Sequence, residues 1–314
     1  MAKHLYDILR LLRPRQWIKN FSIFASIVFA GQLFNSQAFN KVFLGFIVFC
    51  LLSSATYIIN DLFDLKKDRL HPFKKFRPLA HRDIPLYVGI SMATILAAVS
   101  IFLGSLVTPA FFLVLLVYLF IQFLYSSFLK SVAVIDILAI ASGYIIRVLA
   151  GEFASGIHLS VWLLLTTISI SLFLAIGKRR SELTLVSRIQ GASIAATRKS
   201  LSHYSERLLD VYLSIFATST FISYSLFTFL ENPKGFNISL GVLLPEFLPT
   251  FLQRKWLMIT ILPVVYGLMR YLQDIYEKHE GESPERVLLS DRPLLFAVLL
   301  WIISVLTIVY VIGP

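Results

Sequence analysis

The chain has 314 residues, of which 57% are hydrophobic and only 15% charged, a balance that excludes an ordinary soluble domain. The formal net charge is +11, and on a membrane protein this excess indicates cytoplasmic loops and anionic ligands rather than nucleic acid. The single cysteine, Cys50, excludes an intrachain disulfide and a cysteine-based metal site. No cleavage site follows the basic N-terminus, so we expect the first hydrophobic segment to be retained.

Nine apolar stretches are long enough to cross a bilayer core, which requires about 20 helical residues. In chain order they cover residues 18–34, 41–59, 86–106, 109–128, 132–150, 159–176, 208–230, 255–272 and 293–312. The first is short and the eighth contains Pro263, so either could be interfacial or broken, and the two-proline segment 236–252 is predicted to lie on the surface as a loop. The sequence therefore predicts an all-α, polytopic membrane helical bundle of about nine helices, a single domain over 1–314, and a homo-oligomer is one of the arrangements it allows.

Lys and Arg are distributed unevenly between the two sets of loops. With a cytoplasmic N-terminus, 24 of the 29 basic residues fall in cytoplasmic segments, and the outer segments hold only Lys41, Lys234, Arg254 and Lys255. This asymmetry predicts a multi-pass protein of the inner (cytoplasmic) membrane whose polar clusters, and hence its active site, face the cytoplasm.

The most polar stretch, residues 60–78, follows the second apolar stretch and reads NDLFDLKKDRLHPFKKFRP. On a helix, Asp61, Asp64 and Asp68 fall within about 60° of arc and form one acidic face. Converging carboxylates need a cation between them, and Mg2+ prefers such oxygen ligands with phosphate completing its shell. Lys74 and Arg77 follow and can hold phosphate oxygens. The stretch predicts a metal–diphosphate site, with ordinary solvated loop charge as the alternative.

The middle of the chain places ionisable groups inside a predicted span. Asp136 and Arg147 stand three turns apart on one face, about 16 Å along the axis. Such groups are costly in a membrane and tend to line a cavity, although a buried tie between helices would also explain them. Tyr125 and Lys130, at the cytoplasmic mouth of this helix, suit a phosphate, with a snorkelling lysine as the alternative.

The pattern NDxxDxxxDRxHPxKxxRP resembles the first signature of the UbiA-type membrane prenyltransferase superfamily, and specifically its branch of polyprenyl-phosphate (decaprenyl-phosphate type) 5-phosphoribosyltransferases. Four further segments resemble the family's opening element, middle motif, second cytoplasmic loop and C-terminal loop, and together they extend the likeness over essentially the whole chain: RPRQWIKN (13–20), YSSFLKSVAVIDILAIASGYIIRVLAG (125–151), GKRRSE (177–182) and RYLQDIYEKHEGESPERVLLSDRPL (270–294).

The second cytoplasmic loop departs from most UbiA-type enzymes. Those that join an isoprenoid diphosphate to an aromatic acceptor usually carry a second aspartate-rich motif there, whereas this chain reads AIGKRRSELTL, with Glu182 as its one acid. A basic cluster suits a substrate that carries further phosphate. The difference favours phosphoribosyl transfer, with a positive-inside anchor as the alternative interpretation of GKRR.

The resemblance implies Mg2+-dependent transfer of 5-phosphoribosyl from phosphoribosyl pyrophosphate to a polyprenyl phosphate in the bilayer, releasing pyrophosphate, in synthesis of arabinofuranosyl donors for the cell envelope. We expect Asp61 and Asp64, with Asp68 directly or through water, to hold the metal. The expected substrate-binding residues are Lys19, Asn60, Arg69, Lys74, Arg77, Tyr125, Lys130, Asp136, Arg147, Lys178 and Arg179. The alternatives are an aromatic prenyltransferase and a membrane transporter.

Overall fold

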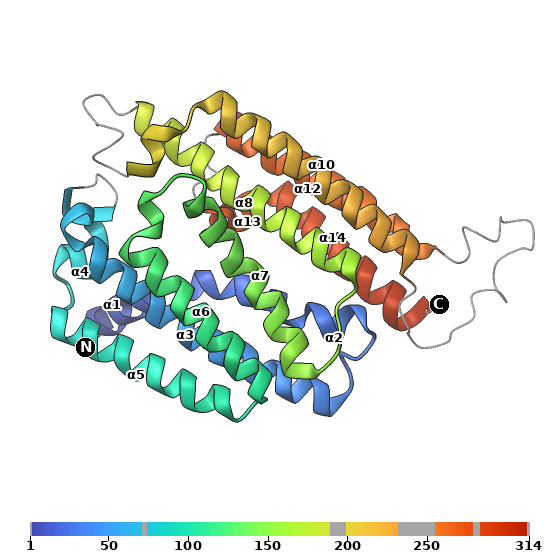
Figure 1. The fold of residues 1–314 in the computed structure, drawn as a ribbon, viewed down its shortest axis with the longest axis horizontal. Coiled ribbons are helices and arrows are strands. Elements are labelled where there is room, and N and C mark those ends of the chain that lie inside the picture. Colours follow the sequence, from blue (N-terminus) through green and yellow to red (C-terminus); the bar gives the residue numbers. More distant parts are fainter. Residues whose placement is uncertain (1, 71–73, 189–198, 232–254, 279–282, 313–314) are drawn as a thin grey trace, which may run out of the picture.

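The computed structural model describes residues 2–70, 74–188, 199–231, 255–278 and 283–312. In this part of the chain the regular elements are all helical (Figure 1). Eight of the described helices are long and apolar enough to cross a membrane. They are built on α3 (Ser36–Leu70), α5 (Leu86–Ser105), α6 (Pro109–Ser127), α7 (Ile135–Ser155), α8 (Val161–Arg188), α10 (Glu206–Leu230), α12 (Ile261–Gln273) and α14 (Arg292–Thr307). The all-α membrane bundle is confirmed, and the expected surface loop 236–252 lies outside the described residues.

The first of the nine expected spans differs from the prediction. It consists of a 3-10 helix, η1 (Pro14–Phe24), and a short α-helix, α2 (Ala25–Phe29), which follow the N-terminal helix α1 (Ala2–Leu12). A 3-10 helix rises about 2.0 Å per residue against about 1.5 Å for an α-helix, so the two pieces together extend roughly 30 Å. The segment therefore runs along the bundle from Arg13, bonded to Asp61, to Ile27 and Val28, whose carbonyls accept from the Tyr310 hydroxyl.

Local signals in the sequence fix where several spans begin. Thr108 caps α6 by accepting a hydrogen bond from the backbone N–H of Phe111, and Asp291 caps α14 in the same way with that of Leu294. A proline directly follows the cap of α6 and stands second after the cap of α14, within the first turn, where its missing N–H costs nothing. Cap and proline together start each helix at the end of the preceding connection.

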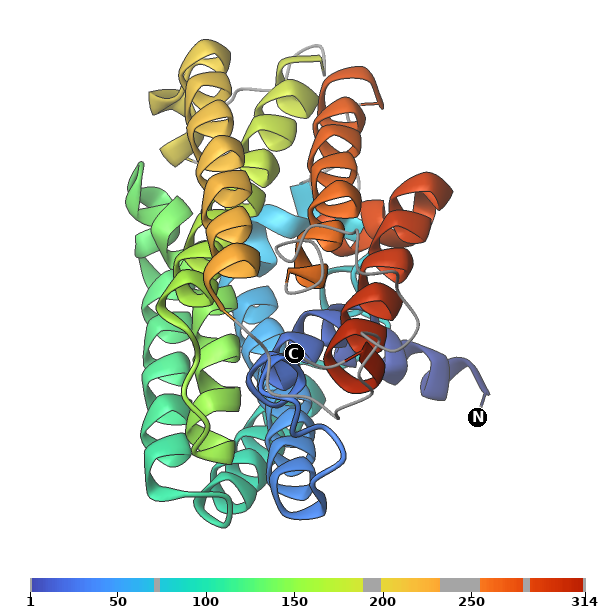
Figure 2. The same ribbon diagram turned by 90° about the vertical axis from the view of Figure 1, so that its right-hand side faces the viewer.

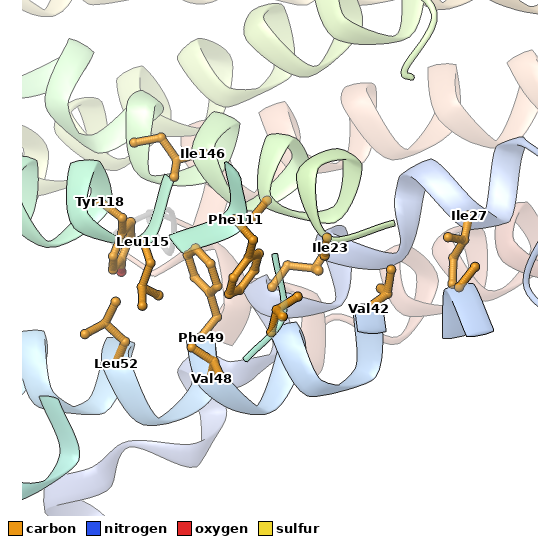
Figure 3. Close-up of a cluster of buried hydrophobic side chains, with 14 residues drawn as sticks. Ile23, Ile27, Val42, Val48, Phe49, Leu52, Phe111, Leu115, Tyr118 and Ile146 are labelled. Atoms are coloured by element: carbon orange, nitrogen blue, oxygen red, sulfur yellow. The ribbon is translucent and has the colours of Figure 1, made fainter. Parts of the chain in front are cut away.

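Of four hydrophobic clusters among the described residues, the two largest join most of the long helices. One joins α3, α6 and α7 to η1 and α2 through buried side chains, including Ile23, Phe49 and Phe111 (Figure 3). The other joins α7, α8, α10 and α12 around Phe173 and Tyr271. Figure 2 shows α10, α8 and α12 as neighbouring helices. The hydrophobic core between them stabilises the C-terminal half of the bundle.

Short helices connect the spans at one end of the bundle, which we call the polar end because the last turns of α3, Asp61 to Arg69, lie there. These connecting elements are η2 (Lys74–Phe76), α4 (Pro78–His81), η3 (Leu129–Ser131), η4 (Lys199–His203) and α13 (Pro284–Ser290). Three further short elements extend spans: η6 (Trp256–Thr260), η7 (Asp274–Lys278) and η8 (Ile308–Ile312). The polar motifs, far apart in sequence, meet at the polar end.

Candidate active site

The acidic face of α3 consists of Asp61, Asp64 and Asp68, and its two outer carboxylates share one arginine. Arg77 Nη1 lies 3.0 Å from Asp61 and 2.6 Å from Asp68. Burial disfavours a charged Arg77 side chain, but the Asp61 and Asp68 carboxylates outweigh it and raise the pKa of Arg77. The predicted juxtaposition of the aspartates with Arg77 is therefore present in the fold.

Arg13 is a site residue that the sequence analysis did not select. Its Nη2 donates to both carboxylate oxygens of Asp61, at 2.6 and 2.5 Å. The backbone at Arg13 is left-handed, with φ 54°, a conformation uncommon for residues other than glycine. This turn leads from α1 into η1, and the proline that follows disfavours continuation of α1 as a helix. An arginine directly before Pro14 was the available signal.

The third carboxylate of the acidic face binds a different base. Lys130, in η3, donates to Asp64 at 2.7 Å and to the Asn60 side chain at 3.3 Å. Lys130 is buried, so the snorkelling alternative does not describe it. Lys130 and Asn60 thus lie beside the acidic face, while Arg69 is exposed on α3.

The donor chemistry of the acidic face fits a hard divalent cation. Among the described residues no three acidic or histidine side chains stand close enough to hold a metal as they are. Each carboxylate instead binds a cationic nitrogen, from Arg13 and Arg77 or from Lys130, within 3.0 Å. The three carboxylates thus attract positive charge at the positions of these nitrogens. Carboxylate oxygens are also the ligands that Mg2+ prefers.

Arg179 and Asp136 form a buried ion pair. Arg179 Nε lies 2.6 Å from Asp136, and both side chains are 0% exposed. Arg179 also bonds Glu182 at 2.5 Å and the Tyr125 hydroxyl at 3.1 Å. The remaining oxygen of Asp136 accepts from the Tyr204 hydroxyl at 2.7 Å. The three expected substrate ligands in this network, Tyr125, Asp136 and Arg179, therefore bind one another and tie α6, α7 and α8 together.

Arg147 also makes its hydrogen bonds to protein groups inside the bundle. Its Nε donates to Asn20 at 2.7 Å, its Nη2 to the Tyr118 hydroxyl at 2.9 Å, and its Nη1 to the Gly143 carbonyl. All three nitrogens have partners and the residue is buried. The structure thus shows the buried tie between helices that was the alternative interpretation.

Lys19 lies in a second cluster, on η1 and opposite α13. Its Nζ is 3.0 Å from Glu285 and 2.6 Å from the Gln16 side-chain oxygen. Burial opposes the charge of Glu285, but Lys19 and Lys178 prevail and lower its pKa. The contact between Lys19 and Glu285 joins η1 to α13.

Lys74 and Lys178 are the remaining expected ligands: Lys74 lies 3.8 Å from Glu182, and Lys178 is partly exposed on α8. Glu182 therefore stands between Lys74 of the first signature and Arg179 of the GKRRSE segment, which was expected in a loop and lies on α8. This acid links the two motifs and holds the basic residue of η2 beside the acidic face.

Comparisons with known proteins show which proteins the chain resembles. The profile of the UbiA prenyltransferase family matches residues 20–303. The chain is 36% identical to a protein of Mycolicibacterium smegmatis named decaprenyl-phosphate phosphoribosyltransferase, over 96% of this chain and 92% of the relative. A protein of the same name from Corynebacterium glutamicum is 36% identical over 98% of this chain and 89% of its own.

A solved structure shares the fold. A UbiA homologue from Archaeoglobus fulgidus, bound to GPP and Mg2+, has a TM-score of 0.70 with 18% identity, over 96% of this chain and 99% of that chain. The same homologue bound to DMAPP and Mg2+ has a TM-score of 0.68. At this identity the likeness concerns the arrangement of the helices.

Proposed function

Because the chain belongs to the UbiA prenyltransferase family, we propose that it transfers 5-phosphoribosyl from phosphoribosyl pyrophosphate to a membrane polyprenyl phosphate of the decaprenyl-phosphate type. Relatives that bear this activity in their names match nearly the full length of the chain. The product would be a lipid-linked pentosyl precursor for cell-envelope glycans. The positive-inside asymmetry supports an active site that faces the cytoplasm, where the donor is available.

The observation that carries this proposal is that Glu182 is surrounded by basic residues. It is the only acid of the second loop motif, and its carboxylate binds Arg179 at 2.5 Å and approaches Lys74 at 3.8 Å. With Glu182 as its one acid, the GKRRSE segment lacks the cluster of carboxylates that another metal–diphosphate would need. One acidic face beside several bases suits a substrate pair that carries phosphate on both partners.

The transfer reaction does not require a general base in the protein. The acceptor phosphate is already anionic at neutral pH, so one of its oxygens attacks C1 of the ribose, and the bond from C1 to the pyrophosphate oxygen breaks. Asp61, Asp64 and Asp68 would hold Mg2+, which when bound supplies charge neutralisation for the leaving pyrophosphate. Arg77, Lys74 and Lys130 would exchange their carboxylate partners for phosphate oxygens and stabilise the charge that develops.

The test uses the purified protein in detergent with radiolabelled phosphoribosyl pyrophosphate and a polyprenyl monophosphate, with and without Mg2+. We expect label in the organic phase only when metal is present. Turnover of an isoprenoid diphosphate and an aromatic acceptor, with no phosphoribosyl transfer, would replace the proposal with ordinary prenylation.

A further inference from the structure

The N-terminal helix α1 has two apolar faces, and only one of them packs on the bundle. Leu11 is buried in a cluster with side chains of α3, α4 and α5, and Ile8 packs against the same cluster. Tyr6 and Leu9, on the opposite face of the helix, are 61% and 46% exposed. Figure 2 shows α1 extending sideways from the bundle, across the direction of the spanning helices. The second apolar face is therefore uncovered by the described part of the chain.

The connecting element η2 extends this exposed face. Arg10 Nη2, on α1, donates to the Phe76 carbonyl at 2.8 Å, and the Arg10 guanidinium lies 5.7 Å from the centre of the Tyr6 ring. The Lys75 ammonium lies 5.2 Å from the centre of the Phe76 ring, and Phe76 is 53% exposed. The contacts join cationic and apolar side chains of both elements into one exposed surface. We call it the α1–η2 surface, and it consists of Tyr6, Leu9, Arg10, Lys75 and Phe76.

The α1–η2 surface is positively charged. Arg10 and Lys75 are both exposed, and Arg82, which directly follows α4 in the chain, is exposed as well. The acids of the same segments offset this charge only in part, since Asp7 is buried 3.9 Å from Arg10 and Asp83 is bound to the histidine of α4. Exposed cations beside apolar side chains are complementary to a partner that is both anionic and amphipathic.

The surface of an anionic bilayer is such a partner. An amphipathic helix in the membrane interface buries its apolar side chains at the boundary of headgroups and acyl chains, and its Lys and Arg side chains meet anionic headgroups. A soluble anion would use the cations of the α1–η2 surface but not the apolar side chains beside them, so the composition favours a lipid. The surface also lies outside the proposed substrate site. Lys74 and Arg77 approach carboxylates, whereas the two residues between them are exposed.

From these observations we propose that the α1–η2 surface docks on the bilayer and binds the headgroups of anionic phospholipids. Tyr6, Leu9 and Phe76 enter the boundary between headgroups and acyl chains, as tyrosine does at membrane interfaces. Arg10 and Lys75 contact the lipid phosphates. Because α1 leads directly into η1, docking holds α1 in the plane of the membrane at the point where the chain enters the bundle. The proposal is independent of the proposed reaction, since it rests on side chains outside the acidic face.

A fluorescent probe on α1 tests the docking in the full-length protein. Leu9→Cys is labelled with NBD, while the native Cys50 is buried, and the protein is placed in nanodiscs of phosphatidylcholine with increasing phosphatidylglycerol. The readout is quenching of NBD by a phospholipid that carries a doxyl group near its headgroup. We expect quenching to rise with the anionic fraction and to fall at high salt. Arg10→Gln and Lys75→Gln should each raise the phosphatidylglycerol fraction at half-maximal quenching about fivefold, the effect of one cation near an anionic surface.

Arg207→Gln is the matched control. Arg207 is exposed near the start of α10, which lies on the other side of the bundle from α1 (Figure 2), so its loss should leave the titration unchanged. Lys75→Gln tests the surface even if Arg10→Gln, which also alters the contact with η2, does not fold. The proposal is overturned if quenching is absent, if it is equal with and without phosphatidylglycerol, or if both variants titrate as the labelled parent does. Disulfide-linked dimers through Leu9→Cys in native membranes, without quenching in discs that hold one copy, would instead assign the surface to a second copy of the chain.

Discussion

Arg77 places one nitrogen between the carboxylates of Asp61 and Asp68, and Arg13 also binds Asp61. Asp61 thus carries two cationic partners and is the most strongly coordinated acid of the α3 face. A carboxylate that attracts this much positive charge is the best candidate to hold a metal ion when the basic side chains turn to phosphate.

Asp61→Asn keeps the size of the side chain and removes its charge. We expect phosphoribosyl transfer to fall about 10²- to 10³-fold, the loss typical of removing one electrostatic contact to the transition state. Single-turnover transfer measured across a Mg2+ titration provides the readout. Glu206→Gln, which removes a half-exposed partner of Arg180, should retain activity. Full Mg2+-dependent turnover by folded Asp61→Asn would refute the assignment of Asp61 to the metal.

Arg179→Met should act on stability first. It leaves Asp136 and Glu182 buried without their partner, and breaking a buried pair from one side costs about 3 to 5 kcal/mol. We expect a lower midpoint of thermal unfolding in detergent than for Arg180→Met, whose partners Glu206 and Asp210 are more exposed. An unchanged midpoint together with lost transfer would show instead that Arg179 contacts substrate.

At the scale of residues, the sequence predicted the types of side chain at the site better than their partners. The spacing of the aspartates and the nearby bases followed from helical geometry. Asp136 binds Arg179, which is 43 positions further along the chain. This contact depends on how α7 and α8 pack, and no local sequence pattern predicts it. Arg13 was missed for the same reason, since its contact with Asp61 requires the left-handed turn at the start of η1.

At the scale of elements, η1 owes its position to α7. A Cβ on Gly151 would lie 1.8 Å from the Ile23 carbonyl oxygen, so only glycine allows the 3-10 helix to approach this closely. The hydropathy of residues 18–34 predicted a span here, and the segment does run along the bundle. Its 3-10 form could not be read from the sequence, because the same apolar pattern serves both kinds of helix and tertiary packing decides between them.

Gly151→Ala should therefore displace η1. We expect destabilisation of about 1 to 3 kcal/mol or more from overpacking, seen as a lower unfolding midpoint, with weaker activity because Arg13 and Lys19 lie on or next to η1. Gly267→Ala is the matched control, since its nearest neighbour would be 3.9 Å away and alanine favours a helix. Equal midpoints for the two variants would contradict the close packing of η1 on α7.

At the scale of the whole molecule, the long apolar stretches predicted the bundle because backbone groups in lipid must satisfy one another, and helices do so locally. The expected and observed spans agree along most of the chain. The meeting of five distant motifs at the polar end follows from the same topology. Each passage through the membrane alternates the end, so the connections rich in Lys and Arg fall on one side.

The orientation of that polar end can be tested with single cysteines. Cys50 is buried and is the only native cysteine, so an impermeant maleimide should not label the parent protein. His158, whose side chain is 94% exposed, lies between α7 and α8 at the end opposite Lys75, which is exposed in η2. Because basic loops remain in the cytoplasm, His158→Cys should be labelled in right-side-out membrane vesicles and Lys75→Cys only after permeabilisation. The reverse pattern would place the acidic face outside, away from a cytoplasmic donor, whereas labelling of both from one side would break the alternation of α5, α6 and α7.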